Sequence, residues 1–307
     1  MNHQRLLTFP LIVILLALVC SLLWGSAFPC VKIGFRLFDI ESSTPGKLYF
    51  AAFRFLLAGA LILAGVRLCG RSIRLPRKKD YALMVVLGLV HTTFQYTFFY
   101  IGLSHTTGMK ASIINGAGSF FLVIYSHWFV KNDRVAPGTL LGLFLGFSGL
   151  VLINVSRTSF SPGFHFMGEG FILCAALASV AAMVIVKDSS MRIYPPLVGG
   201  YQLFFGALGL LAVSLATDDP GVLHWSASGL ALCVYLSFVS AAAFPLWYAL
   251  VKYNSLSKMA VYRFLIPVCG TVLSAALLDA ETFNVYVVVS LVLVSAGMIL
   301  TSLGSSG

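Results

Sequence analysis

The sequence predicts an all-α polytopic membrane protein whose ten transmembrane helices form two inverted five-helix repeats. Three observations predict this fold class: the composition, the spacing of charged residues, and a long internal repeat. Of the 307 residues, 59% are hydrophobic and only 10% are charged, whereas a soluble domain carries roughly 25% charged residues. This composition excludes an ordinary soluble globular protein.

Charged residues mark the ends of the predicted helices, because a charge in the middle of a span costs roughly 2.5 to 3.5 kcal/mol. A hydrocarbon core of about 30 Å needs roughly 20 helical residues. Two apolar stretches, between Lys47 and Arg67 and between Lys258 and Asp279, each contain one arginine. Eight uncharged runs bring the total to ten, and they lie between Arg5 and Lys32, Asp80 and Lys110, Lys110 and Lys131, Arg134 and Arg157, Glu169 and Lys187, Arg192 and Asp218, Asp219 and Lys252, and after Glu281.

Basic residues predict the orientation of the helices, because cytoplasmic loops of membrane proteins collect Lys and Arg. The loops on the side of the N-terminus hold most of them, including the run at 67–79. We therefore expect a plasma (inner) membrane protein with both termini in the cytoplasm. The net charge of +10 then reflects topology, and no nucleic-acid partner is expected. The six cysteines show no CxxC pattern, so we expect neither a metal nor another cofactor.

A repeat divides the predicted helices into two sets of five. Residues 148–152 (SGLVL) resemble residues 296–300 (AGMIL), and the same shift of 148 aligns 53–63 with 201–211. It also carries Asn115 onto Arg263, and near the start a shift of 155 carries Lys32 onto Lys187. We assign 1–157 to the first repeat and 158–307 to the second, with 303–307 as a linker or disordered tail. Because five is odd, the second repeat crosses the membrane in the opposite sense, an arrangement typical of secondary transporters with a site at mid-membrane.

Several segments together resemble the EamA family of the drug/metabolite transporter (DMT) superfamily. They are residues 22–32 (LLWGSAFPCVK), Arg54, residues 100–103 (YIGL), the acid after helix 4, and residues 142–152. The resemblance covers the whole chain and implies ten helices, a central cavity lined by both halves, and export of amino acids or related metabolites. The sequence departs from the family at Ser119, where proline is usual, and keeps Pro267 at the equivalent place in helix 9.

Helices 1 to 3 each contain a candidate for the substrate site. Trp24 lies deep in helix 1 before Pro29, which can kink the helix and allow gating. Arg54 has no acid predicted at its depth, so it either binds a substrate carboxylate or ties helices together through backbone carbonyls. His91 lies about 16 Å beyond Asp80, near the midplane, with Gln95 one turn further on. Both either bind substrate, with His91 also able to couple protons, or form hydrogen bonds between helices.

Helices 4 and 9 supply the strongest candidate for the substrate site. Ser112, Asn115 and Ser119 are spaced by three and four residues, so they form one polar stripe on helix 4. Helix 9 places Arg263 and Pro267 at the two later positions, and the proline frees a backbone carbonyl that something else must satisfy. The alternative for Arg263 is an extended side chain that reaches the cytoplasmic surface.

The remaining candidates are aromatic, acidic or small residues. Tyr248 on helix 8 and Tyr262 on helix 9 are expected to line the pocket, whereas Trp128, Trp225 and Trp247 are expected in the interfacial aromatic belt. Glu169 opens helix 6, where it either complements the helix N-terminus or serves as a gating or coupling carboxylate. The glycines of helices 5 and 10 allow close helix contact, either within a monomer or across a homodimer, and they are Gly142, Gly146, Gly149 and Gly297.

These features predict a secondary transporter for a small metabolite, most simply an amino acid or related carboxylate, that works by alternating access. The resemblance implies export; uptake or facilitated diffusion of another solute, and a passive lipid or ion pathway, are the alternatives. The sequence lacks the GxxxxGK[ST] loop of nucleotide hydrolysis and the HExxH motif of zinc enzymes. We therefore expect no enzyme. The expected partners are the small-molecule substrate and the lipid bilayer.

Overall fold

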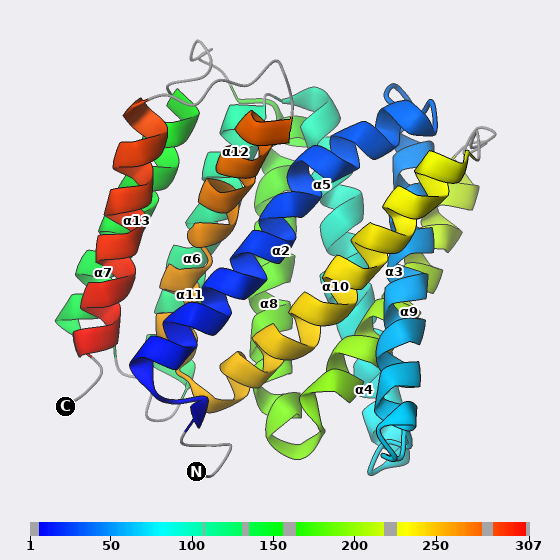
Figure 1. Cartoon of the computed structure of the whole chain (residues 1–307), viewed down its shortest axis with the longest axis horizontal. Coiled ribbons are helices and arrows are strands. Elements are labelled where there is room, and N and C mark those ends of the chain that lie inside the picture. Colours follow the sequence, from blue (N-terminus) through cyan, green and yellow to red (C-terminus); the bar gives the residue numbers. More distant parts are fainter. Residues whose placement is uncertain are drawn as a thin grey trace.

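The computed structural model describes residues 6–106, 108–130, 135–155, 164–217, 226–277 and 285–304. These residues form a bundle of membrane-length helices (Figure 1). Eight helices are long and apolar enough to cross a membrane, and two shorter apolar ones, Ile113–Phe129 and Pro137–Leu152, complete the predicted ten. The elements are α2 (Pro10–Leu37), α3 (Thr44–Leu68), α4 (Lys78–Gly88), η1 (Leu89–Phe94), α5 (Gln95–His105), α6 (Gly108–Phe129), α7 (Pro137–Val155), η2 (Phe166–Gly170), α8 (Phe171–Arg192), α9 (Pro195–Thr217), α10 (Ala227–Tyr253), α11 (Leu256–Tyr262), α12 (Leu265–Leu277) and α13 (Val285–Gly304).

The helix bounds repeat with the spacing found in the sequence. Adding 148 to the bounds of α6 gives Leu256 and Leu277, which are the first residue of α11 and the last residue of α12. The third membrane helix, built from α4, η1 and α5, matches α10 in the same way, and α7 matches α13. The first helix, α2, matches the η2–α8 helix with a shift of 155. The halves therefore correspond helix by helix.

Packing follows the same correspondence. Helix α2 packs against α10 and α12 of the second half, and the equivalent η2–α8 helix packs against α5 and α6 of the first half. Helices α3 and α9 are equivalent to each other and pack together, as do α7 and α13. Figure 1 shows these two self-paired contacts at opposite ends of the bundle, with both chain termini on one side. Exchanging the halves thus maps the α2 contacts onto those of η2–α8 and maps the α3–α9 and α7–α13 contacts onto themselves.

Glycines allow the close approach of α7 and α13. A Cβ atom on Gly142 would lie 2.4 Å from the carbonyl oxygen of Gly297, and one on Gly149 would lie 3.0 Å from that of Ser290. The shift of 148 carries Gly142 onto Ser290 and Gly149 onto Gly297, so the two approaches are equivalent by the repeat. Gly146 leaves room for the ring of Phe264, since a Cβ atom on Gly146 would lie 2.4 Å from Cδ2 of that ring. These glycines therefore form contacts within the monomer.

Two membrane helices are interrupted within their span. Pro267 cannot donate to the carbonyl of Arg263, which instead accepts a 3.1 Å hydrogen bond from the backbone of Ile266, and the helix breaks between α11 and α12. The third helix contains the π-helical turn η1, which the sequence did not predict. By contrast, α2 stays a single helix through Pro29. One interruption lies at Arg263 and the other includes His91, and both are candidate site residues.

Candidate functional site

A chain of buried polar side chains joins three helices at the centre of the protein. The Tyr248 hydroxyl donates to Oε1 of Gln202 at 2.9 Å, and Nδ1 of His91 lies 2.9 Å from the same hydroxyl. Gln202 Nε2 donates in turn to the Thr92 hydroxyl. Because the Tyr248 proton is used toward Gln202, its oxygen accepts from a protonated Nδ1 of His91. Helices η1, α9 and α10 are thereby connected by a hydrogen-bond chain whose members are all buried.

The sequence around η1 explains how this chain forms. Thr93 donates to the backbone carbonyl of Gly206 at 2.9 Å. A Cβ atom on Gly206 would lie 2.4 Å from Cβ of Thr92, and one on Gly209 would lie 2.2 Å from the Thr93 hydroxyl. Only glycines permit α9 to approach this closely. The π turn, a feature that is frequent at functional sites, lies at this contact and includes His91, Thr92 and Thr93.

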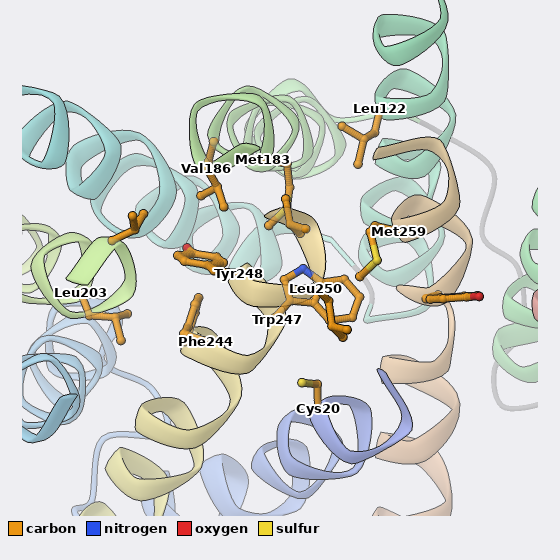
Figure 2. Close-up of a cluster of buried hydrophobic side chains, with 14 of the residues drawn as sticks. Cys20, Leu122, Met183, Val186, Leu203, Phe244, Trp247, Tyr248, Leu250 and Met259 are labelled. Carbon is orange, nitrogen blue, oxygen red and sulfur yellow. The ribbon is translucent and has the colours of Figure 1, made fainter. Parts of the chain in front are cut away.

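Aromatic rings form one wall beside His91. The Trp24 ring lies 5.2 Å from that of Phe244 and 5.5 Å from that of Trp247, and Phe244 in turn lies 6.0 Å from His91. Figure 2 shows side chains from several elements converging around α10, among them Cys20, Leu122, Met183, Leu203, Phe244, Trp247, Tyr248 and Met259. The structure therefore brings together Trp24, His91 and Tyr248, three residues that the sequence predicted for the site.

Trp247 is not a belt residue, and the expectation that placed it at the interface was wrong. Its side chain is 1% exposed, because it packs against Trp24 of α2 in a part of α10 whose last carbonyls are bound by Lys187 of α8. Trp128 is 77% exposed near the end of α6, as expected for the belt. Trp225 lies outside the described residues.

Arg263 points toward the bundle interior. Its Nη2 donates to the Ser179 hydroxyl of α8 at 3.0 Å, whereas its Nη1 is buried without a hydrogen-bond partner among the described residues. The contact with Ser179 gives no support to an extended, surface-reaching side chain.

Arg54 occupies a pocket of phenol and phenyl rings. It is 5% exposed, and its guanidinium carbon lies 4.2 Å from the centre of the Phe55 ring. The Phe55 ring lies 4.8 Å from that of Tyr96, which lies 6.2 Å from that of Tyr100, and the Arg54 Nε is buried without a partner among the described residues. A guanidinium in this setting retains the capacity to bind an anion.

The other predicted site residues differ in how deeply they are buried and in which helices they contact. Gln95 is half-buried with an unpartnered Oε1, and on α6 Asn115 is half-buried whereas Ser119 is buried. The side chain of Ser112 lies outside the described residues. Tyr262 is fully buried beside Ser302 of α13, so it belongs to that helix contact and not to the His91 chain. Pro267 is half-buried at the helix break.

Glu169 lies at one end of the bundle. Its carboxylate accepts from the Thr106 hydroxyl at 2.7 Å and from the backbone of His165 at 2.6 Å, and it is 5% exposed. The end of α5 is about 21 Å along the helix from His91, so Glu169 is remote from the central chain. At the opposite end, Arg192 lies 3.4 Å from Asp80. Charged groups thus fasten the third helix to the sixth at both ends.

Sequence reasoning missed Gln202, Thr92 and Ser179. Gln202 had a signal, because the shift of 148 places it at the position of Arg54 and places Tyr248 at that of Tyr100. Thr92 and Ser179 carry no comparable pattern, since small hydroxyl residues are frequent in membrane helices.

Comparisons with known proteins agree with this architecture. The EamA-like transporter family matches residues 11–155 and 166–303. An uncharacterized transporter of Archaeoglobus fulgidus is 26% identical over 94% of this chain and 96% of its own length. The uncharacterized transporter YyaM of Bacillus subtilis is 26% identical over 92% of this chain and 90% of its own length. A solved crystal structure has a TM-score of 0.78 at 19% identity, covering 94% of this chain and 96% of that one, which shows a shared fold.

Proposed function

The chain belongs to the EamA-like transporter family, a family of membrane transporters and not of enzymes, and from this premise we propose its substrate class and mode of action. The protein is a secondary transporter that moves an amino acid or a related carboxylate by alternating access. The two units that move are the repeats, 1–157 and 158–307. The substrate lies between them, at the centre defined by His91 and Tyr248.

One observation carries this proposal: two guanidiniums, one from each repeat, lie within the bundle, which also holds a buried polar and aromatic centre. A charged group inside a membrane protein is costly and typically faces a substrate pathway. Arginine binds carboxylates through two parallel hydrogen bonds. Arg54 and Arg263 each keep a buried N–H without a partner among the described residues, and the aromatic wall around Trp24 can hold the apolar part of a small substrate.

We further propose that the protein lies in the plasma membrane with both termini in the cytoplasm and that it exports its substrate. The distribution of Lys and Arg supports this orientation, and export follows from the family resemblance. Uptake and facilitated diffusion use the same site and differ only in the driving force. His91 at the centre and Glu169 at the end of the bundle are the candidate groups for proton coupling. The protein works as a monomer or as a homodimer.

Purified protein in liposomes tests this function. Vesicles loaded with labelled amino acids and organic acids should show saturable flux, and Arg263→Ala and Asn115→Ala should raise KM or abolish flux. Arg36→Ala is the matched control, because Arg36 is an exposed residue that pairs with exposed Glu41 at 3.3 Å. Saturable flux that both site variants leave unchanged would reject the proposed site, and the absence of saturable flux for every solute would reject the transporter for this substrate class.

A further inference from the structure

The stretch from the end of α3 to the start of α4 is the most basic part of the chain. Residues 67–79 contain six basic residues and no acid, and all six are exposed. They are Arg67, Arg71, Arg74, Arg77, Lys78 and Lys79. Topology requires basic residues on this side of the membrane, but it does not require them to be held in a fixed arrangement.

The backbone that carries these residues is fixed by two tyrosines. The Tyr201 hydroxyl donates to the carbonyl of Ile73 at 2.9 Å, and the backbone of Leu75 donates to the Tyr81 hydroxyl at 3.2 Å. The rings of the two tyrosines lie 5.5 Å apart, and Leu75 is only 7% exposed. Tyr81 belongs to α4 and Tyr201 to α9 of the second half. Both halves of the protein therefore hold residues 67–79 in place.

The acid that follows directly in the chain does not balance these charges. Asp80 is 2% exposed, and its carboxylate accepts a hydrogen bond from the backbone of Arg77 at 3.0 Å and lies 3.4 Å from Arg192 of α8. Both of its oxygens are thus used for a helix cap and an internal ion pair. The exposed basic side chains remain available to an anion from outside the protein.

Residues 67–79 lie at the level of the lipid headgroups. Helix α3 has 25 residues, so it is about 38 Å long, which exceeds a hydrocarbon core of about 30 Å. Its last residue, Leu68, is 87% exposed. The guanidinium carbon of Arg71 lies 4.7 Å from the centre of the Tyr194 ring, and Tyr194 is 42% exposed, as is typical of tyrosine at a membrane–water interface.

We propose that residues 67–79 form a binding surface for anionic phospholipids. Charge complementarity carries this assignment, because arginine binds phosphate oxygens through parallel hydrogen bonds and clusters of Lys and Arg next to a membrane helix attract anionic lipids. Each basic residue near the surface strengthens this attraction about 5-fold. A nucleic acid or an acidic protein would have to displace headgroups that already surround the segment, so the lipid is the favoured partner. The inference does not depend on the proposed substrate.

A fluorophore on Cys69 tests this inference, because Cys69 is exposed and lies within the basic stretch. The labelled protein is placed in vesicles of equimolar phosphatidylglycerol and phosphatidylcholine, in which one lipid or the other carries a nitroxide quencher. We expect phosphatidylglycerol to be enriched beside Cys69 by at least about 10-fold. Added salt should reduce the enrichment, because it screens exposed charges. A fluorophore on Ser42→Cys in a Cys69→Ser background, at the other end of α3, should show no comparable enrichment.

Variants with fewer charges separate this surface from the net charge of the protein. Arg74→Gln combined with Lys79→Gln should lower the enrichment at Cys69 by at least about 5-fold. Lys32→Gln combined with Arg36→Gln is the matched control, since it removes two exposed charges from the opposite end of α2 and should leave the enrichment unchanged. Size-exclusion chromatography checks folding, and the salt dependence of the unmodified residues decides the test if the first variant does not fold.

Three outcomes would overturn the inference. The first is equal quenching by the two lipids at Cys69, and the second is an equal loss of enrichment in the two double variants. The third is binding of a labelled oligonucleotide to the protein in vesicles that contain phosphatidylglycerol, which would assign the surface to nucleic acid. None of these measurements requires transport, so saturable flux without a lipid preference would leave the proposed function standing.

Discussion

At the scale of single residues, the central hydrogen-bond chain depends on the hydroxyl of Tyr248. It is the only link between His91 and Gln202 in the described hydrogen-bond chain, and it serves as donor to one and acceptor from the other. Buried polar groups cost more when they lose a partner than they gain when they have one. The arrangement of the site therefore depends on one oxygen atom.

Tyr248→Phe should lower stability and weaken substrate binding together. Removing the hydroxyl leaves His91 Nδ1 and Gln202 Oε1 each without this partner, at a cost of about 1 to 3 kcal/mol. Thermal melting followed by size-exclusion chromatography measures the change. Tyr235→Phe is the matched control, because Tyr235 is 42% exposed and its hydroxyl lies 2.8 Å from that of Ser26. Equal melting temperatures for the two variants would contradict the importance of the buried chain.

Trp247→Ala should be severely destabilising, by about 3 to 5 kcal/mol, because it removes a large side chain from a packed interior. The comparison variant is Trp128→Ala on the exposed face of α6, where the change should stay within about 0.5 kcal/mol. Denaturation in detergent, monitored by the loss of monodisperse protein, gives both values. Similar losses for the two tryptophans would show that Trp247 is not in the core.

At the scale of helices, close packing depends on positions where a side chain cannot fit. The α7–α13 and α9–η1 contacts both place glycine against the backbone or a β-carbon of the neighbouring helix. In a membrane, helix association relies on such close approach, because lipid chains are as apolar as the helix surfaces. Each contact therefore has its own steric requirement, which a single methyl group can test.

Gly142→Ala should destabilise the protein, because the new Cβ would lie 2.4 Å from the Gly297 carbonyl oxygen and 2.2 Å from the Thr301 hydroxyl. Gly65→Ala in α3 is its opposite, since nothing lies within 4 Å of the would-be Cβ. There alanine should stabilise by roughly 0.5 to 1 kcal/mol, through helix propensity. Melting temperatures should fall for the first variant and stay equal or rise for the second. A neutral Gly142→Ala would contradict the α7–α13 contact.

At the scale of the whole molecule, the position of both termini on one side gives a test of topology. Cys69 is the exposed cysteine among the six and follows α3, so it lies on the side of the N-terminus. A membrane-impermeant maleimide should label it in inside-out vesicles and not in intact cells. Ser42→Cys in a Cys69→Ser background, in the exposed segment before α3, should show the reverse. Labelling of Cys69 from outside would invert the proposed orientation.

The ten helices and their correspondence between the two halves could be predicted from the sequence. The positions of Arg and Lys mark the ends of the spans, and the 148-residue shift is visible in residues such as Gly149 and Gly297. The sequence also predicted Arg54, Trp24, His91 and Tyr248 as site residues, and their role in the site stays a prediction. The π turn at Leu89–Phe94 could not be predicted, since it depends on how closely α9 approaches through Gly206. Trp247 was misplaced because depth was judged from the helix end, whereas the end of α10 is enclosed by other helices.

The self-paired helices have a consequence for the working cycle. When a transporter built from inverted repeats exchanges the conformations of its halves, a contact between equivalent helices becomes itself, and a contact between unlike helices becomes its counterpart. The contacts of α3 with α9 and of α7 with α13 can thus keep the same geometry throughout the transport cycle. Under the alternating access that we propose, the contacts that α2 and α8 form exchange their geometries. Substitutions there should bias the resting population of inward-facing and outward-facing forms, whereas substitutions in the α3–α9 and α7–α13 contacts should affect both forms alike.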